Sequence, residues 1–193
     1  ELSGKGINSK GFKSGKGIGL KEADSELGRS EAIELLRKVF SLGTTFLSRT
    51  GFTLSANDLD VPKSVKDKRD KIIQSAEVKT QKIIESYYDK NMELLPGKTA
   101  EETRELNILK VLNETRTHMG DAVKEGFPKD NLANKMISSG AKGSILNITQ
   151  IACSVGQQVL NGRRIDFGYT GRTLSVFKKG DLSPKAGGFI YRS

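Results

Sequence analysis

Between Ser30 and Thr50 the apolar residues recur every three or four positions, which is the period of an α-helix with one buried face. Ser30 is a residue type that caps helix N-termini, and Gly51 is a type that ends helices. The pattern therefore predicts a core helix over 30–50. Its apolar or small positions are Ile33, Leu36, Val39, Phe40, Gly43, Phe46 and Leu47.

Two longer helices are predicted next. From Pro62 to about Leu95 the chain is charged and lacks internal glycine and proline, and proline is favoured in a first helical turn. Thr99 with Glu102 forms a capping box that opens a second helix, which is expected to end near Gly126. The apolar stripes are Val65, Ile72, Ala76, Ile83 and Tyr87 in the first helix, and Leu106, Leu109, Leu112, Met119 and Val123 in the second.

Because such narrow stripes need a partner alongside, the two helices are expected to form a projecting antiparallel hairpin with its tip at 94–98 (LLPGK). Asp130 is expected to cap a short helix. The sequence NGRR at 161–164 indicates a hairpin turn, and 163–167 and 188–192 are expected to contain short strands. The predicted fold class is mainly α with small β elements.

The stretch 139–158 places a lysine between glycines directly before a segment of helical period. A helix start favours anions, so Lys142 is a candidate phosphate contact, with a solvated lysine as the alternative. Gly140 and Lys142 are too close together for a P-loop. The polar side of this predicted helix is rich in amides, which could bind bases, sugars or protein, or form a buried network. These amides are Asn147, Gln150, Gln157 and Gln158.

The charge favours a polyanionic partner, since 32 Lys and Arg against 23 Asp and Glu give a net charge of +9. A lysine-rich solvated surface would give the same balance. The single cysteine, Cys153, excludes an internal disulfide and favours a reducing, cytoplasmic setting. No run approaches the ~20 apolar residues of a transmembrane helix. Because the chain begins without methionine and stops after GGFIYRS, we expect a piece of a longer polypeptide.

The tail after 160 combines basic and aromatic residues in the manner of surfaces that bind single-stranded nucleic acid. Loops that anchor an interface between subunits would show the same composition. The residues concerned are Arg163, Arg164 and Arg172, near Phe167 and Tyr169.

Patterns for catalysis are weak. The glycine- and lysine-rich residues 1–20 include GKGIG, but neither a strand before it nor a helix after it is predicted, so a flexible basic arm is favoured. His118 is the only histidine and is expected to be solvated or to pack. The sequence shows no aspartate cluster for two metal ions, no Ser/His/Asp arrangement and no activated cysteine.

A longer pattern covers 139–193, and it is carried by Gly140, Lys142, Gly143, Ser144, Asn147, Gln150, Val155, Gly156, Gln157, Gln158, Gly162, Arg164, Arg172, Thr173, Leu174, Phe177 and Gly188. This region resembles the largest subunit of cellular multisubunit DNA-dependent RNA polymerase, between the funnel domain and the bridge helix. Upstream, 51–54 (GFTL) and 95–116 resemble the archaeal form of that polypeptide, the A′ type.

The resemblance implies that the chain forms the funnel around the secondary channel, where nucleoside triphosphates enter and backtracked RNA 3′ ends leave. Lys142 would then lie beside the incoming triphosphate. The helical hairpin would dock transcript-cleavage factors, with Lys98 and Arg104 as candidate contacts. Support of the bridge helix and trigger loop is implied for Asn147, Gln150, Gln157, Gln158 and Arg164.

Three domains are implied: the end of the pore domain at 1–60, the funnel hairpin at 61–139, and the end of the funnel with the start of the cleft-forming domain at 140–193. Other polymerase subunits, and DNA through the assembly, would be partners, and no membrane contact is implied. The magnesium ions of the assembled nucleotidyltransferase would be held outside this chain. The isolated chain is therefore expected to hold no cofactor and to catalyse no reaction.

Three residues, at two places in the chain, depart from the family's usual pattern. Ser175 and Val176 replace a Pro-His pair, and Gly187 stands where a larger polar residue is common. Two alternatives remain open at this point: a stand-alone basic module that binds nucleic acid, and a free regulator that mimics the polymerase funnel.

Overall fold

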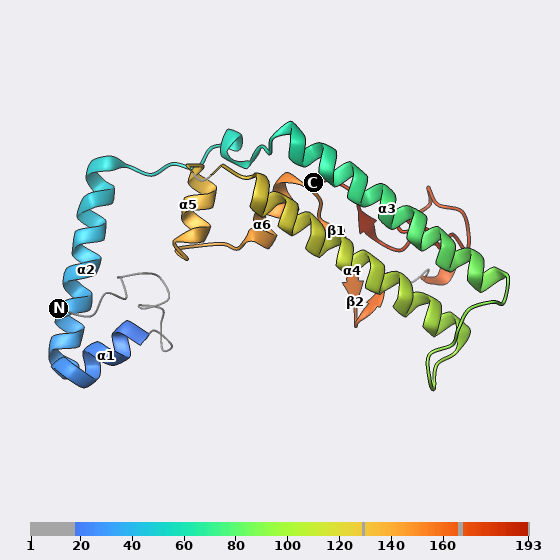
Figure 1. Cartoon of the computed structure of the whole chain (residues 1–193), viewed down its shortest axis with the longest axis horizontal. Coiled ribbons are helices and arrows are strands. Elements are labelled where there is room, and N and C mark those ends of the chain that lie inside the picture. Colours follow the sequence, from blue (N-terminus) through green and yellow to red (C-terminus); the bar gives the residue numbers. More distant parts are fainter. Residues whose placement is uncertain (1–17, 129, 166–167, 193) are drawn as a thin grey trace. The chain divides into compact units, whose positions relative to one another are not determined.

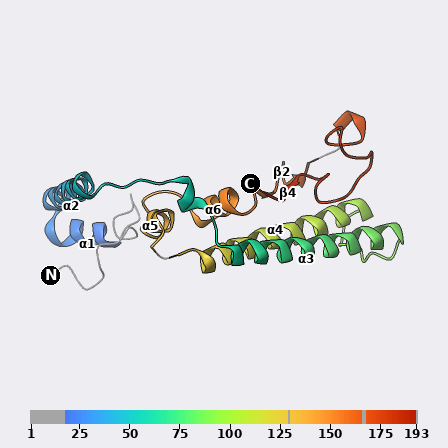
Figure 2. The ribbon, with the colours of Figure 1, turned by 90° about the horizontal axis from the view of Figure 1, so that it is seen from above.

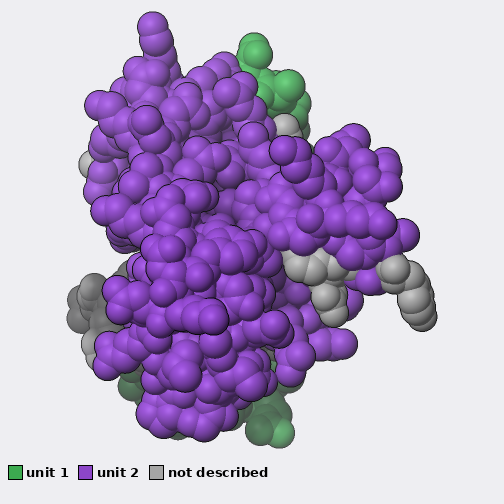
Figure 3. Space-filling view, turned by 90° about the vertical axis from the view of Figure 1, so that its right-hand side faces the viewer, with its two compact units in different colours: residues 1–58, 129–144 green, residues 59–128, 145–193 purple. Residues whose placement is uncertain are grey.

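The computed structural model describes residues 18–128, 130–165 and 168–192 (Figure 1). The chain divides into two compact units, 1–58 with 129–144 and 59–128 with 145–193, which Figure 3 colours separately. Each unit is described by itself. The described residues form six α-helices and only short strands, so the predicted mainly α class is confirmed. Among them, no helix is both long enough and apolar enough to cross a membrane.

Unit 1 contains α1 (Ile18–Leu27), α2 (Arg29–Thr50) and α5 (Leu132–Ser138). Residues 56–59 form a 3-10 turn. Gly28, with a φ of 82°, separates α1 from α2, so the predicted cap at Ser30 is wrong. The end of α2 is as predicted, because the Gly51 N–H donates to the Leu47 carbonyl at 2.8 Å. Helix α1 was not predicted, and residues 1–17 of the expected basic arm lie outside the described residues.

The prediction of a core helix over 30–50 is wrong about burial. Ala32 is the single buried residue of α2, while Ile33, Phe46 and Leu47 are exposed and Phe40 is 78% exposed. The reason is that, among the side chains that the structure describes, the packing of α1 against α2 buries only Ala23 and Ala32. The apolar stripe of α2 therefore remains in contact with solvent.

Unit 2 is built on the antiparallel pair of α3 (Lys63–Tyr88) and α4 (Ala100–Gly126), the predicted hairpin (Figure 2). The capping box is present, since Thr99 Oγ1 accepts from the Glu102 N–H at 3.2 Å and Glu102 Oε2 accepts from the Thr99 N–H at 3.1 Å. Helix α3 ends at Tyr88 and not near Leu95, because Lys90 adopts a φ of 56° and turns the chain.

The hairpin core differs from the predicted stripe on α3. Val65 and Ala76 are buried as predicted. Ile72, Ile83 and Tyr87 are half-buried, and in the first two cases the next residue along the chain is the buried one. On α4, Leu112, Met119 and Val123 are buried as predicted, whereas Leu106 is exposed. Near the open end, a Cβ on Gly126 would overlap Val65, so glycine permits the close approach of the two helices there. The buried α3 residues are Val65, Ile73, Ala76, Thr80 and Ile84.

The C-terminal part of unit 2 lies along α4, which contacts α6 (Ile145–Ala152), β1 (Gly156–Gln157) and β3 (Arg163–Arg164) (Figures 1 and 2). Strand β1 pairs with β4 (Phe189–Ile190), and β2 (Val159–Leu160) pairs with β3, both antiparallel. These pairs confirm the predicted turn and short strands.

The β2–β3 turn has positive φ at both central residues, 50° at Asn161 and 77° at Gly162, as a tight type I′ hairpin requires. The predicted helix through 158 is wrong. It stops at Ala152 because Gly156, with a φ of 82°, starts strand β1.

Candidate functional site

The predicted phosphate contact, Lys142, lies in the loop of unit 1 that follows α5. Gly140 and Gly143 adopt positive φ values of 75° and 80° on either side of it. The Lys142 side chain is exposed, and the backbone N–H of Lys142 donates to the Met136 carbonyl at 3.4 Å. The lysine is therefore accessible on a glycine-hinged loop, and its contact with a phosphate stays a prediction.

Helix α5, which leads into this loop, is capped by Asn131 and not by Asp130. Asn131 Oδ1 accepts from the Asn134 N–H at 3.1 Å, and Asn131 Nδ2 donates to the Asp58 carbonyl at 2.8 Å. The cap thus also ties α5 to the end of the 51–58 segment. That second bond explains why Asn131 occupies the cap position.

The predicted amide stripe divides into two parts in unit 2. Asn147 and Gln150 lie one turn apart on α6, with Asn147 exposed and Gln150 half-buried. Gln157 belongs to β1 and is only 3% exposed, and Gln158 follows the strand. A single helical stripe of four amides is therefore wrong, because the helix ends before Gln157.

Gln157 holds the C-terminal segment of its own chain. Its Nε2 donates to the carbonyls of Gly187 at 2.7 Å and Gln158 at 2.6 Å. The Gln158 N–H donates to the Gly188 carbonyl at 3.0 Å, and Ser154 Oγ donates to the Ile190 carbonyl at 2.8 Å. These bonds fasten residues 187–190 against β1.

Arg164, in β3, is 6% exposed, so it is not part of a basic surface for single-stranded nucleic acid. Its Nη2 donates to the carbonyls of Leu182 at 3.1 Å and Ser183 at 2.9 Å. Nη1 lies 3.6 Å from Glu105 Oε2 on α4. Burial lowers the pKa of the Arg164 guanidinium, and the nearby Glu105 carboxylate opposes that shift.

The other residues of the predicted basic and aromatic surface are dispersed. Arg163 is exposed, and Arg172 Nη1 donates to the Ser175 carbonyl at 3.2 Å. Phe167 and the side chain of Tyr169 lie outside what the structure describes. The described residues thus give this surface one exposed arginine, Arg163.

Glu105 joins the hairpin to the C-terminal segment, and no pattern in the sequence marked it. Its Oε1 accepts from Arg104 Nε at 3.0 Å, and the Arg104 guanidinium lies 4.3 Å from the centre of the Tyr87 ring. A line of contacts therefore runs from α3 through Arg104, Glu105 and Arg164 to the loop at 182–183.

This line also affects the two residues predicted to dock a cleavage factor. Arg104 is buried and packs inside the hairpin, so its charge is not offered to a partner. Lys98, in the turn before α4, is exposed. Docking at Lys98 stays a prediction.

Gly187 has a structural reason for departing from the family pattern. A Cβ at this position would overlap the Arg164 guanidinium, so the absence of a side chain makes room for the buried arginine. Next to it, Thr173 Oγ1 donates to the Ala186 carbonyl at 2.7 Å. At the other departure from the family pattern, Ser175 and Val176, the Val176 side chain is 80% exposed.

The chemistry of these residues is binding and positioning. Burial raises the pKa of the Cys153 thiol, which keeps this buried group protonated at neutral pH. His118 is exposed on α4, in agreement with the expectation of a solvated histidine. Among the described residues, no three His, Cys, Asp or Glu side chains could hold a metal ion together.

The comparisons with known proteins identify the family. The family model described as RNA polymerase Rpb1, domain 4, matches residues 83–190, which include α4, α5, α6 and all four strands. The DNA-directed RNA polymerase subunit Rpo1N of Halobacterium salinarum is 41% identical over 166 residues, covering 86% of this chain and 17% of that relative.

Two further subunits with the same name extend the comparison. That of Methanothermobacter thermautotrophicus is 38% identical over 188 residues, covering 97% of this chain and 22% of the relative. That of Halococcus morrhuae is 40% identical over 171 residues, covering 87% and 49%. The chain thus spans less than half of each relative's length. It belongs to the RNA polymerase Rpb1 domain 4 family.

Proposed function

We propose that this chain is the funnel-region part of the largest subunit of an archaeal DNA-directed RNA polymerase, where it forms a wall of the secondary channel. The main support for the proposal is that the family match at 83–190 coincides with a long two-helix hairpin and with the segment that packs against it. The enzyme activity, nucleotidyl transfer with magnesium, belongs to the assembly. This chain contributes the surface and the charged side chains of the channel wall.

Within that assembly, Lys142 contacts the triphosphate of the incoming nucleotide. The support for this role is its exposed position on a loop with positive-φ glycines, which allow the backbone to approach an anion closely. Asn147 and Gln150 face the catalytic elements of the assembly, the bridge helix and trigger loop. Gln157, Gln158 and Arg164 support these elements indirectly, because their hydrogen bonds hold the segment at 182–190 in place.

The hairpin is the docking site for a transcript-cleavage factor, and RNA 3′ ends pass beside it. The structure directs the test to Lys98, because this exposed lysine can be reversed in charge without disturbing the core, whereas Arg104 cannot. In the assembled polymerase, Lys98→Glu should reduce factor-stimulated RNA cleavage and leave elongation rate unchanged.

The matched control is Lys124→Glu, the same charge change on an exposed lysine in the last turn of α4. Equal loss of cleavage and elongation in Lys98→Glu, or equal effects of both variants, would remove the docking claim.

The net charge of +9 favours one alternative, a free basic module that binds nucleic acid. Sequencing the parent gene separates the two. The polymerase proposal requires an aspartate-rich metal loop upstream and a bridge-helix segment downstream of this region.

A further inference from the structure

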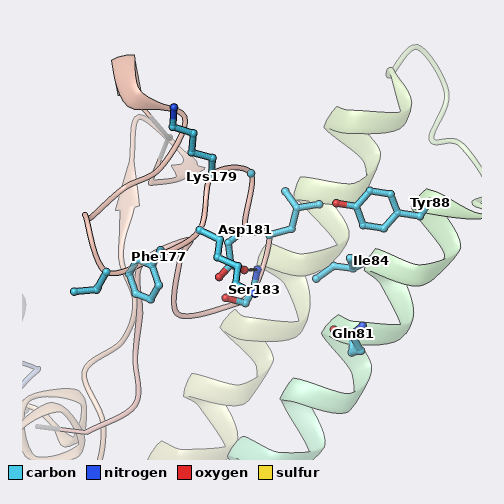
Figure 4. Close-up of a pocket in the computed structure, with 11 residues that line it drawn as sticks. Gln81, Ile84, Tyr88, Phe177, Lys179, Asp181 and Ser183 are labelled. Carbon is cyan, nitrogen blue, oxygen red and sulfur yellow. Dashed lines mark hydrogen bonds between the residues drawn. The ribbon is translucent and has the colours of Figure 1, made fainter.

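Unit 2 contains a groove that the proposed roles do not use. It has a volume of about 600 Å³ and lies between the C-terminal half of α3 and the loop 176–183 (Figure 4). Gln81, Ile84 and Tyr88 line it from α3, and Phe177, Lys179 and Asp181 line it from the loop. Both walls belong to the same compact unit.

The groove has an apolar floor and apolar edges. Ile84 and Leu182 are buried in its floor, while Tyr88 and Val176 at its sides are exposed. Exposed apolar side chains beside a concave apolar floor are characteristic of binding surfaces.

The charge at the groove is positive. Lys178 and Lys179 are exposed on the loop, and Asp181 is the one acidic residue among those that line the groove. Asp181 Oδ1 already accepts from the Ser183 N–H at 2.9 Å, so its carboxylate is engaged in its own turn. The two lysines are therefore the charges offered to a partner, and they favour carboxylates or phosphates.

The residues in the floor of the groove favour a partner with carboxylates over one with phosphates. A single-stranded nucleic acid needs flat aromatic surfaces on which bases stack. The floor residues Ile84 and Leu182 are aliphatic, and the two aromatic residues that line the groove, Phe177 and Tyr88, stand on opposite walls, so they do not form a row on which successive bases stack. The surface therefore fits an aliphatic side chain flanked by carboxylates better than it fits a base.

The loop wall is held in position before any partner binds. Arg164 Nη2 donates to the carbonyls of Leu182 and Ser183, and the Gly180 N–H donates to the Gly171 carbonyl at 2.9 Å. A wall fixed in advance loses little conformational entropy on binding, which raises affinity.

We propose that the groove between α3 and loop 176–183 binds a protein segment that presents an aliphatic side chain next to acidic residues. The aliphatic side chain occupies the space above Ile84 and Leu182, and its acidic neighbours pair with Lys178 and Lys179.

The test uses the full chain and two fluorescein-labelled probes, a short peptide of alternating Leu and Asp and a single-stranded RNA of similar length. Fluorescence anisotropy at physiological salt should show saturable binding of the Leu/Asp peptide. Lys178→Glu with Lys179→Glu should weaken it by about tenfold or more, the loss expected when charge-assisted contacts are removed. Val176→Asp should weaken it as well, by repelling the acidic residues.

The control variant is Lys124→Glu, which makes one of the same charge changes in the last turn of α4 and should leave peptide binding unchanged. NMR of the wild-type chain gives a measurement that does not depend on the folding of variants, because the peptide should shift the methyl signals of Ile84 and Leu182.

Three results would overturn the proposal. These are no saturable peptide binding, equal weakening by Lys124→Glu, and tighter binding of the RNA than of the peptide at the same lysines. None of these bears on the polymerase proposal, which depends on assembly and not on this groove.

Discussion

Replacing Gly187 by alanine tests whether the buried arginine fixes the C-terminal segment of unit 2. The added methyl group would overlap the guanidinium of Arg164, which is almost completely enclosed. The backbone of Gly187 does not adopt the left-handed φ that penalises side chains, so the effect comes from packing alone. Arg164 would have to move away.

The size of the effect follows from the bonds that this movement breaks. Arg164 would lose its hydrogen bonds to the Leu182 and Ser183 carbonyls, and a hydrogen bond from a charged donor contributes about 1.5–3 kcal/mol. Overpacking of a filled interior costs about 1–3 kcal/mol. Since part of the loss is recovered by relaxation, we expect unit 2 to lose about 2–4 kcal/mol of unfolding free energy.

The assay is urea unfolding of the wild type and the variant, followed by circular dichroism. Gly120→Ala is the control in the same unit, because a Cβ there lies 3.9 Å from Thr149 Oγ1, an ordinary contact. On the helix α4 this change should be neutral or stabilise by up to about 1 kcal/mol.

A double-mutant cycle gives the result that would refute the reasoning. In an Arg164→Met background the clash partner is absent, so Gly187→Ala should then cost less than about 1 kcal/mol. If Gly187→Ala has the same effect in both backgrounds, Arg164 is not the residue that requires glycine at 187.

Three other changes have defined outcomes. Lys142→Ala in the assembled polymerase should weaken nucleotide use by about 1.5–3 kcal/mol, measured from the nucleotide dependence of elongation, and an unchanged dependence would argue against the contact. Gly126→Ala should destabilise the hairpin by about 1–3 kcal/mol in urea unfolding, because its Cβ would overlap Val65; the same cost in a Val65→Ala background would contradict this. Because the Phe40 and Phe46 rings are exposed on α2, we expect the isolated chain to self-associate through this face. Phe40→Ser with Phe46→Ser should then bring the mass by light scattering closer to the 21.1 kDa monomer, and a monomeric wild type would exclude this self-association.

The parts of the fold that were predictable are those with local causes. The Thr99–Glu102 capping box, the helix end at Gly51 and the turn at 161–162 each depend on a few neighbouring residues. The end of α3 at Tyr88 was missed because Lys90 has no sequence feature that marks a left-handed residue. Periodicity alone also could not choose between Ile72 and Ile73 as the buried position, since the choice depends on where α4 lies.

Lys142, the four amides and Arg164 were marked as candidates by the residue pattern and by the family resemblance, but their contacts were not predictable. Gln157 reaches Gly187, and Arg164 reaches Leu182, across stretches of chain that fold back only in three dimensions. No sequence pattern distinguishes Glu105, because a glutamate on a charged helix is common. The burial of Arg104, the other predicted docking residue, was not predictable for the same reason, since it depends on Tyr87 from the other helix.

The polymerase assignment is tested most directly by purifying the native protein through an affinity tag and identifying what accompanies it. We predict that it co-purifies with the other large subunit of RNA polymerase, and that the preparation synthesises RNA from a DNA template. A photo-cross-linker introduced at Lys142 should then label a bound nucleoside triphosphate. Purification of the tagged protein without polymerase subunits and without template-dependent synthesis would contradict the account.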